Sequence, residues 1–348
     1  MQIAEKNKIF LHVADELSLL INTKANELFY ALKNFDASKF DTSNTYTDYF
    51  LHHHLGNRLF FSIQNSAHIL YQGIKKCNQP IHTIIAIDYG AGLGTLFMLG
   101  GLLGFKQFDY NDHLPEWQPT AATICTAISS TISNFITGDI DAVTEFASKQ
   151  RFKYQLVVSR NVIEHIYNLS NFYTAIFLHN PTAVTYSTTT ANYHNIAMRW
   201  YHIYIHKKVE KSYVQQRIIQ IKKLHPTLNQ QQLIQAAKFS KGKGQQDFIT
   251  TLQHFVTNQP IIIDTTLRSN TCDCIHGVWC EHLLTKKEYA AIIHKAGFAI
   301  EFTAGYWDTH YKWSIFNFVA TIFNKLIHAL GKKNGILLSP FVNVISHN

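Results

Sequence analysis

The sequence predicts an α/β fold, in which a doubly wound, mostly parallel sheet of seven strands carries an N-terminal helical cap and a helical insertion. Two observations lead to this prediction. Short β-branched segments alternate with segments whose apolar residues recur at helical spacing, and this alternation favours a parallel sheet covered by helices on both faces. A basic segment without the alternation, residues 191–265, divides the predicted sheet into two parts.

Residues 1–80 are predicted to form the helical cap. Apolar residues recur at helical spacing over residues 14–35, a polar break follows at 36–48, and one or two further helices are expected within 49–76. The first twenty residues carry acidic side chains where a secretory signal peptide needs an apolar stretch, and the longest apolar run is too short to cross a bilayer. These features predict a cytoplasmic protein without a membrane span.

Residues 81–190 are predicted to form the first part of the sheet. Their β-branched content indicates five strands, at 82–88, 105–112, 134–139, 154–160 and 182–190. Helices are expected between them at 93–104, 120–129 and 161–179. Ligands of such sheets bind at the carboxyl ends of the strands, so residues that follow a strand are the candidates for a site.

Residues 191–265 are predicted to form a basic helical insertion, with a long helix or a helix pair at 200–225 and another helix at 228–239. The segment has ten Lys and Arg against three Asp and Glu, so it supplies +7 of the formal net charge of +8. Such charges usually form a solvated helical face. The alternative is an anionic partner, which could be an acidic substrate, nucleic acid or a membrane surface.

Residues 266–348 are predicted to complete the sheet. A helix is expected at 284–297, where Thr285 is the N-cap, Glu288 occupies the capping-box position and Gly297 ends the helix. Strands are expected at 298–303 and 339–346. A helix at 313–330 carries an apolar stripe that we interpret as core-facing, with a lid or a dimer seam as the alternative. The stripe comprises Ile315, Phe316, Val319, Ile322, Phe323, Leu326, Ile327 and Leu330.

The stretch IDYGAGLGT, residues 87–95, joins the first predicted strand of the sheet to a helix. Glycines at such a turn let a ligand approach the backbone, and dinucleotides and S-adenosylmethionine both bind in this way. The dinucleotide fingerprint requires a third Gly or Ala, but those positions hold Thr95 or Phe97. An acid at the strand end, Asp88, suits a ligand with a positive amino group better than a pyrophosphate.

At these residues the chain resembles the class I S-adenosylmethionine-dependent methyltransferases, which have a Rossmann-like fold. The resemblance continues in order through the second, third and fourth strands and covers residues 81–190 and 279–348. It implies that Asp112, with Asp109 as the rival, bonds the ribose hydroxyls, and that Asp139 and Ile140 contact the adenine. The implied cofactor-binding residues are Asp88, Tyr89, Gly90, Gly92, Gly94, Asp112, His113, Asp139, Ile140, Ser159 and Arg160.

The stretch VIEHI supplies the candidate catalytic residues His165 and Glu164. A hydroxyl acceptor needs a general base, and we assign this role to His165, with Glu164 orienting it or contacting the ligand. The alternatives are that both residues only shape the start of a helix, or that His194 is the base. Tyr46, Tyr49 and Arg58 are plausible residues on the substrate side. The sequence does not indicate the oligomeric state.

Two classes of acceptor are disfavoured. Enzymes that methylate amino groups of bases or glutamine amides usually carry an Asn/Asp-Pro-Pro-aromatic motif after the fourth strand, where this chain has SRNV at residues 159–162. Cytosine ring-carbon methylases use a Pro-Cys nucleophile, and the chain has no Pro-Cys pair.

The stretch TCDCIHGVWCEH raises the question of a metal. It places Cys272, Cys274, His276, Cys280 and His282 within eleven residues, and four such residues could form a tetrahedral zinc site. Their spacings are tighter than usual for zinc, so we expect a packed loop and no metal. Five cysteines in the whole chain fit reduced thiols rather than a disulfide framework.

The sequence therefore predicts S-adenosylmethionine-dependent methyl transfer to a small-molecule or lipid-like acceptor. The first alternative is a nucleic-acid-binding protein, or an RNA methyltransferase, that uses the basic insertion. A protein that holds the cofactor without catalysis and a nicotinamide-dependent dehydrogenase are the remaining alternatives.

Overall fold

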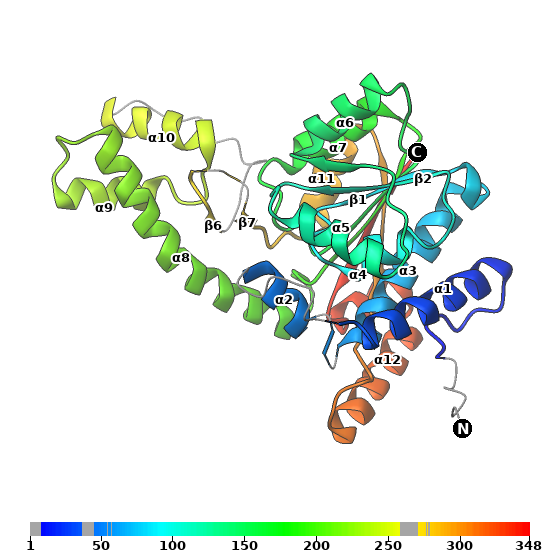
Figure 1. Ribbon diagram of the computed structural model, residues 1–348. Coiled ribbons are helices and arrows are strands. Elements are labelled where there is room, and N and C mark those ends of the chain that lie inside the picture. The colour runs from blue at the N-terminus through cyan, green and yellow to red at the C-terminus, as the bar shows by residue number, and fades with distance from the viewer. Residues whose placement is uncertain are drawn as a thin grey trace.

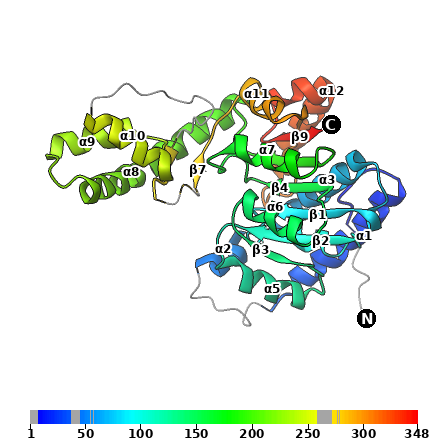
Figure 2. The same cartoon turned by 90° about the horizontal axis from the view of Figure 1, so that it is seen from above.

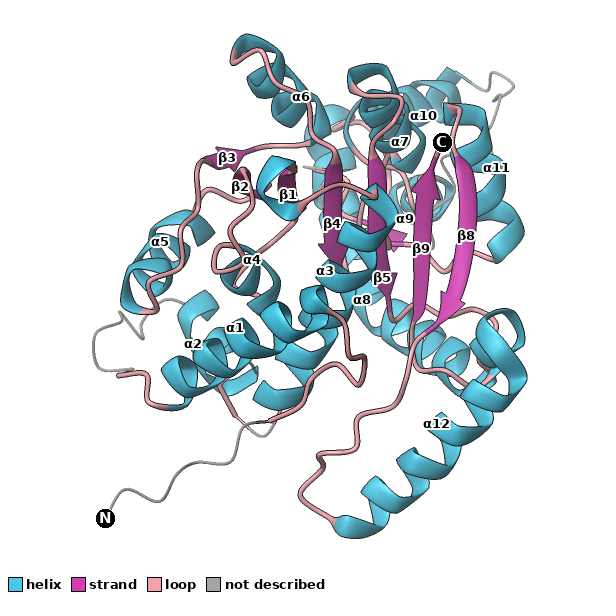
Figure 3. Ribbon diagram, turned by 90° about the vertical axis from the view of Figure 1, so that its right-hand side faces the viewer, coloured by secondary structure: helices cyan, strands magenta, loops and turns pink. Residues whose placement is uncertain are grey.

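The computed structural model describes residues 8–36, 45–53, 55–56, 58–257, 271–275, 277 and 279–348. Its centre is a seven-stranded sheet in the order β3-β2-β1-β4-β5-β9-β8, with helices on both faces (Figures 1 and 3). The strands are β1 (Ile85–Tyr89), β2 (Gln107–Asp112), β3 (Phe135–Thr137), β4 (Leu156–Arg160), β5 (Val184–Thr189), β8 (Ala299–Ala304) and β9 (Val342–His347).

The sheet is mostly parallel. Strand β1 pairs in parallel with β2 and β4, and the parallel pairing continues outward to β3 and β5. Only β9 runs against its neighbours β5 and β8. The strand order reverses between β1 and β4, which places a topological switch point at the carboxyl ends of these two strands. The predicted doubly wound, mostly parallel seven-stranded sheet is confirmed.

Two apolar cores lie on opposite faces of the sheet, because alternate residues of each strand point to opposite sides. Ala86 and Val158 belong to the core under the N-terminal helices, whereas Ile87 and Val157 belong to the other. Helices on the first side are α1 (Glu16–Lys33), α3 (Leu59–Cys77), α4 (Thr95–Gly100) and α5 (Trp117–Ala127), and those on the second are α6 (Ile140–Lys149), α7 (Leu169–His179) and α11 (Lys286–Ala296).

Both ends of α11 are capped as the sequence predicts. The Thr285 side chain accepts a hydrogen bond from the Glu288 backbone amide, and the Glu288 side chain accepts one from the Thr285 amide in return. Gly297 ends the helix with φ of 108°, a left-handed conformation that favours glycine. A further cap helix, α2 (Thr45–His53), precedes α3, and the side chains of Tyr46 and Tyr49 on it lie outside the described residues.

The insertion projects from the sheet as a separate arm (Figures 1 and 2). It consists of α8 (Ile196–Leu224), α9 (Gln230–Phe239) and α10 (Gln245–Thr257), followed by the small hairpin β6 (Thr271–Cys272) and β7 (Cys280–Glu281). The first helix is a single long one, and α10 had no predicted counterpart. The arm has a small apolar core of its own, formed by Ile221, Leu233, Ala236, Ala237, Phe248, Leu252 and Cys274.

Arg217 lies inside this arm and is fully buried. Its Nε donates to the Ala237 carbonyl oxygen at 2.9 Å, and its guanidinium pairs with Glu210. One of the ten basic residues of the insertion therefore holds α8 against α9, and it adds nothing to a charged surface.

We expect Arg217→Met to destabilise the arm by about 2 kcal/mol, because the variant loses the bond to the Ala237 carbonyl and leaves the half-buried Glu210 carboxylate without its cationic partner. Hydrogen exchange of the α9 amides measures this local change. Lys211→Met is the matched control, since Lys211 is exposed on the same helix. Equal exchange in the two variants would contradict a structural role for Arg217.

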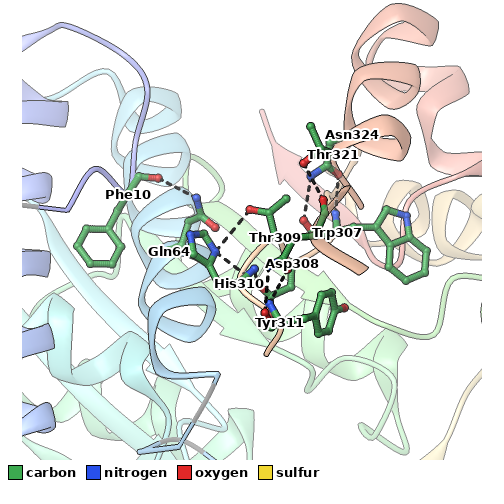
Figure 4. A network of polar contacts seen from close by, with 10 residues as sticks. Phe10, Gln64, Trp307, Asp308, Thr309, His310, Tyr311, Thr321 and Asn324 are labelled. Carbon is green, nitrogen blue, oxygen red and sulfur yellow. Dashed lines mark hydrogen bonds and ion pairs between the residues drawn. The ribbon is translucent and has the colours of Figure 1, made fainter. Parts of the chain in front are cut away.

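The last helix, α12 (Ser314–Asn334), overturns the core-facing interpretation of its apolar stripe. Only Ala320 and Ile327 on this helix are buried, whereas most of the stripe is exposed. Polar contacts attach the helix to the preceding segment, since the Asn324 side chain binds the backbone of Trp307 (Figure 4). Asn317 binds the backbone of Tyr311 in the same way. Among the described residues, no helix is both long enough and apolar enough to cross a bilayer.

Candidate functional site

The candidate site lies at the carboxyl ends of β1 to β4, where the strand order reverses. The turn after β1 connects to α4, whose N-cap is Gly94. Gly90 and Gly92 have φ of 69° and 50°, so both need the conformational freedom of glycine. A side chain at Gly90 would lie 2.6 Å from Val162, whereas a side chain at Gly92 would meet only Asp112, at 4.0 Å. The backbone at Gly92 is therefore open to a ligand.

Asp112, at the end of β2, is bound directly to this turn. Its Oδ2 accepts from the Gly92 amide at 2.9 Å and its Oδ1 accepts from the Leu114 amide at 3.0 Å. Burial raises the pKa of this carboxyl, and the two amide bonds oppose that shift. Asp109, the rival in the sequence, binds Tyr154 and Asn134 in the interior. The geometry thus places Asp112 at the turn and gives Asp109 a structural role.

Asp88, at the end of β1, is 1% exposed, and its Oδ2 has no hydrogen-bond partner. Burial raises its pKa well above the ordinary value, Arg160 lowers it, and the negative charge of Asp112 adds to the rise. A buried carboxylate oxygen without a partner is costly, so this position favours a ligand that brings a positive charge or a hydrogen-bond donor.

The other residues implied as cofactor contacts occupy the neighbouring strand ends. Asp139 follows β3 and caps α6, where its side chain accepts from the Asp141 and Ala142 amides. Ile140 is buried at the start of α6. Tyr89 packs against Phe172 with ring centroids 4.8 Å apart and the ring planes tilted by 54°. His113 is exposed directly after Asp112.

Ser159 and Arg160, at the end of β4, point into the protein. Ser159 is fully buried and its hydroxyl donates to Ser187 at 2.8 Å. Arg160 donates to the backbone and the hydroxyl of Ser62 on α3, and it also reaches the Thr95 hydroxyl at 3.3 Å. Arg160 therefore connects the helical cap to the start of α4.

The segment after β4 differs from the sequence prediction. The helix expected at 161–179 begins only at Leu169, with Asn168 as its N-cap, so Glu164 and His165 lie in a loop. The interpretation that these two residues shape the start of the helix is therefore wrong. Asn161 has φ of 56°, and the loop crosses the glycine turn through the contact between Val162 and Gly90.

His165 is held by the β7 region. Its Nδ1 lies 2.8 Å from the Cys280 carbonyl oxygen, and its ring stacks on Trp279 with centroids 4.3 Å apart. Because a carbonyl oxygen only accepts, Nδ1 carries the proton and Nε2 is left with the lone pair of a base. The carboxylate near His165 Nδ1 is Glu281, at 3.6 Å.

The other two candidates, Glu164 and His194, differ in their surroundings. Glu164 is 1% exposed, its Oε2 has no hydrogen-bond partner, and burial raises its pKa. His194 accepts a hydrogen bond at Nε2 from the Lys286 amide at 3.1 Å, so the atom that would act as a base is already used. Arg58, proposed for the substrate side, stands at the start of α3.

The cysteine-rich stretch does not converge on one point. Cys272 and Cys280 face each other across β6 and β7 with 2.9 Å between their sulfur atoms. Cys274 packs into the core of the arm, and His282 Nε2 binds the Ile166 carbonyl oxygen. His276 lies outside the described residues.

A different group can hold a metal ion. His202 and His206 on α8 and Glu281 on β7 each offer one ligand atom, and these atoms lie within 4.8 Å of one another. The sequence analysis missed this set, although a signal existed, since two histidines four residues apart in WYHIYIHKK share one face of a helix.

The sequence matches no protein-family model, and no curated protein is similar to it. Among solved structures, the chain is similar to an S-adenosylmethionine-dependent methyltransferase from Clostridium acetobutylicum, with 10% identity, a TM-score of 0.44 and coverage of 87% of this chain and 99% of that one.

Two other solved structures show similar values. An S-adenosylmethionine-dependent methyltransferase from Mesorhizobium loti has 9% identity and a TM-score of 0.37, over 80% of this chain and 98% of that one. Phosphoethanolamine N-methyltransferase 2 from Haemonchus contortus, in complex with S-adenosyl-L-methionine, has 10% identity and a TM-score of 0.37, over 88% of this chain and 60% of that one. At such identities the likeness concerns the fold alone.

Proposed function

We propose that this chain is an S-adenosylmethionine-dependent methyltransferase that acts on a small-molecule or lipid-like acceptor. The observation that supports this most directly is the pair of acids at the glycine turn. Asp112 holds the turn through the Gly92 amide, and Asp88 keeps a buried carboxylate oxygen without a partner.

The negative charge near the glycine turn favours S-adenosylmethionine over a dinucleotide as the ligand. Asp88 and Asp112 lie at the carboxyl ends of β1 and β2, and Asp139 follows β3, so all three are at the same edge of the sheet. A dinucleotide would bring a pyrophosphate close to three carboxyl groups, and like charges in a partly buried site repel. S-adenosylmethionine instead carries a net positive charge, because its amino group and sulfonium outweigh its single carboxylate, and acidic side chains attract both cationic groups.

The cofactor supplies the reactive methyl group, and the chain has to position the acceptor and remove its proton. His165 fits the second task, because Cys280 fixes its tautomer and leaves Nε2 as the base. In this proposal, Trp279 fixes the plane of the ring by stacking on it.

We expect His165→Gln to lower turnover by about a hundredfold or more, the usual contribution of a general base, while the affinity for the cofactor holds. The measurement is S-adenosylhomocysteine release with an acceptor found by screening. His194→Gln is the control, since Nε2 of His194 is already bonded to Lys286. Unchanged turnover in the His165 variant would remove the general-base assignment.

We expect Asp88→Asn to stabilise the ligand-free protein by about 1 kcal/mol at neutral pH, because it removes a buried carboxyl whose charge burial opposes. The folded-state pKa of Asp88 is raised, so the wild type loses stability as pH rises through that value, and the advantage of the variant grows with pH. Urea unfolding between pH 5 and 8 measures it, with exposed Asp141→Asn as the control. The same variant should bind S-adenosylhomocysteine more weakly.

Thermal unfolding with S-adenosylhomocysteine, with NADH and without ligand tests the proposed function. A ligand at a hundredfold excess over its Kd stabilises a two-state protein by about 2.7 kcal/mol. We expect a shift with S-adenosylhomocysteine only. A shift with NADH alone, or no shift with either, would overturn the proposal.

A further inference from the structure

His202, His206 and Glu281 form a buried cluster between the arm and the sheet, which we call the His–Glu cluster. The two histidines lie four residues apart on α8 and share one face of that helix. Glu281 reaches the same point from β7. Their exposed fractions are 8%, 6% and 5%, so bulk solvent reaches little of their side chains.

The hydrogen bonds in the cluster are incomplete. Nε2 of His206 lies 3.1 Å from Oε2 of Glu281, whereas neither ring nitrogen of His202 makes a hydrogen bond of normal geometry, although its ring interacts with the Thr190 backbone. Buried polar atoms in folded proteins are nearly always satisfied, so an ion pair between His206 and Glu281 explains only part of the arrangement. A metal ion would also satisfy His202.

The donor set fits zinc, and the separation of one pair of ligand atoms matches tetrahedral coordination, while the three atoms together lie within 4.8 Å of one another. Two ligand atoms bound to zinc in a tetrahedral arrangement lie about 3.3 Å apart, close to the 3.1 Å between His206 and Glu281. The other oxygen of Glu281, Oε1, accepts from the Trp279 indole at 3.1 Å. That bond turns Oε2 toward the histidines, as groups behind metal ligands commonly do.

We propose that His202, His206 and Glu281 bind a zinc ion, with a fourth position left for water or another ligand. The ion would fix the arm to β7, which carries the Cys280 carbonyl and follows Trp279, the two groups that hold His165. This inference does not depend on the proposed activity, because zinc binding is measured without an acceptor or a cofactor.

The test uses the full chain, purified without a histidine tag, stripped with a chelator and titrated with Zn²⁺ alone by calorimetry. We expect one equivalent to bind and to raise the unfolding temperature. His206→Ala and Glu281→Gln should each weaken zinc binding by about a hundredfold or more. Loss of a group that only orients a metal ligand already weakens binding by up to about a hundredfold, and loss of a ligand should cost at least as much. Cobalt substitution should give absorption bands that both variants lose.

Exposed His82→Asn is the matched control, because this chain has 20 histidines and surface ones can bind zinc weakly. Circular dichroism and the metal-free unfolding temperature show whether each variant folds, and Glu281→Gln changes a single atom. Less than a tenth of an equivalent of zinc in the wild type would overturn the site. So would equal affinity in the wild type and both folded variants.

A second inference rests on α12. Its exposed stripe differs from the predicted one, because it includes Phe318 and omits Phe316, Phe323 and Ile327. It consists of Ile315, Phe318, Val319, Ile322, Leu326 and Leu330, whose exposed fractions run from 42% to 64%. Each of these residues lies three or four positions from another member of the set, so they form one continuous face. Trp313, directly before the helix, is 66% exposed. Water is an unfavourable environment for a patch of this composition, so a partner is expected to cover it.

The charges around the stripe indicate which partner. Lys312, Lys325, Lys332 and Lys333 are all exposed, and no acidic residue follows Asp308 in the sequence. The helix itself carries basic and no acidic side chains, although Glu301 on β8 lies near Lys332. An apolar face on a basic helix is typical of helices that lie in the surface of anionic membranes. A second copy of the chain would bring like charges together.

The position of the helix agrees with this partner. Strand β8 is antiparallel to β9, which is antiparallel to β5, so β8 ends at the same edge as the parallel strands. The segment from β8 to α12 thus leaves the sheet at the edge that carries the glycine turn, and Figure 3 shows α12 beyond that edge. We infer that the apolar stripe of α12 docks on an anionic lipid surface.

Vesicle co-sedimentation tests this inference with phosphatidylcholine alone and with added phosphatidylserine. We expect binding to rise with the anionic lipid, and Ile322→Glu to weaken it at least tenfold. Thr321→Glu adds the same charge one residue away on the polar side and should weaken it much less. Absence of binding to both vesicle types would overturn the inference. So would a dimer that Ile322→Glu dissociates, which would assign the stripe to a second copy.

Discussion

Asp112→Ala is expected to weaken S-adenosylhomocysteine binding by at least about a hundredfold. In the proposed complex, the Asp112 carboxylate accepts hydrogen bonds from two ribose hydroxyls. Each hydrogen bond to a charged group contributes about 1.5–3 kcal/mol to the free energy of binding. The variant also releases the Gly92 and Leu114 amides, so the glycine turn loses one of its links to β2. The bonds from the Ala91 amide to Asn111 and from the Tyr110 hydroxyl to the Gly92 carbonyl oxygen remain. Calorimetric titration with S-adenosylhomocysteine measures the loss of affinity.

The matched control is Asp109→Asn. Asp109 is a buried acid on the same strand, and its bonds go to Tyr154, Asn134 and Gln107. We expect this variant to lower the unfolding temperature and to keep its affinity for S-adenosylhomocysteine. The reverse outcome, with affinity lost at Asp109 and kept at Asp112, would reassign the ribose contact and contradict the arrangement proposed for the site.

Gly90→Ala is expected to destabilise the protein by about 4 kcal/mol. A left-handed backbone costs a non-glycine residue about 1–2 kcal/mol, and a further 1–3 kcal/mol is typical of overpacking. Overpacking arises here because the new methyl group would lie 2.6 Å from Val162. Urea unfolding measures the free-energy change.

Gly92→Ala distinguishes the cost of the left-handed backbone from the cost of overpacking, because Gly92 has φ of 50° but no crowded neighbour. This variant should lose only about 1–2 kcal/mol of stability, yet bind S-adenosylhomocysteine poorly, since the methyl group enters the open side of the turn. Adding Val162→Ala should restore part of the stability that Gly90→Ala loses. It should restore none of the stability that Gly92→Ala loses. Equal costs at the two glycines would mean that Val162 does not press on the turn.

Much of the site was predictable because parallel strands place consecutive strand ends at one edge. The alternation of elements located β1 to β5, and the acid at each strand end then followed from position alone. Asp112 was separable from Asp109 by its place at the strand terminus. Local capping chemistry likewise predicted both ends of α11.

The rest depends on contacts between distant segments. The loop before α7 is held by residues 280–282, more than a hundred positions further along, so helical periodicity extended α7 too far. Glu281 meets His202 and His206 only because the hairpin folds against α8. On α12, periodicity correctly predicted an amphipathic helix, but it could not show that the apolar face points away from the core.

The antiparallel strand β9 has a consequence for the order of folding during synthesis. Strand β8 has β9 as its only neighbour in the sheet, and β9 comes some forty residues later in the chain. A ribosome adds the residues between them at about 5–20 per second. During this time β8 has no pairing partner, and the backbone groups on the β5 edge that β9 later covers stay unpaired. Because β9 inserts between β5 and β8, the pairing of β8 into the sheet can form only after residues 342–347 have been synthesised.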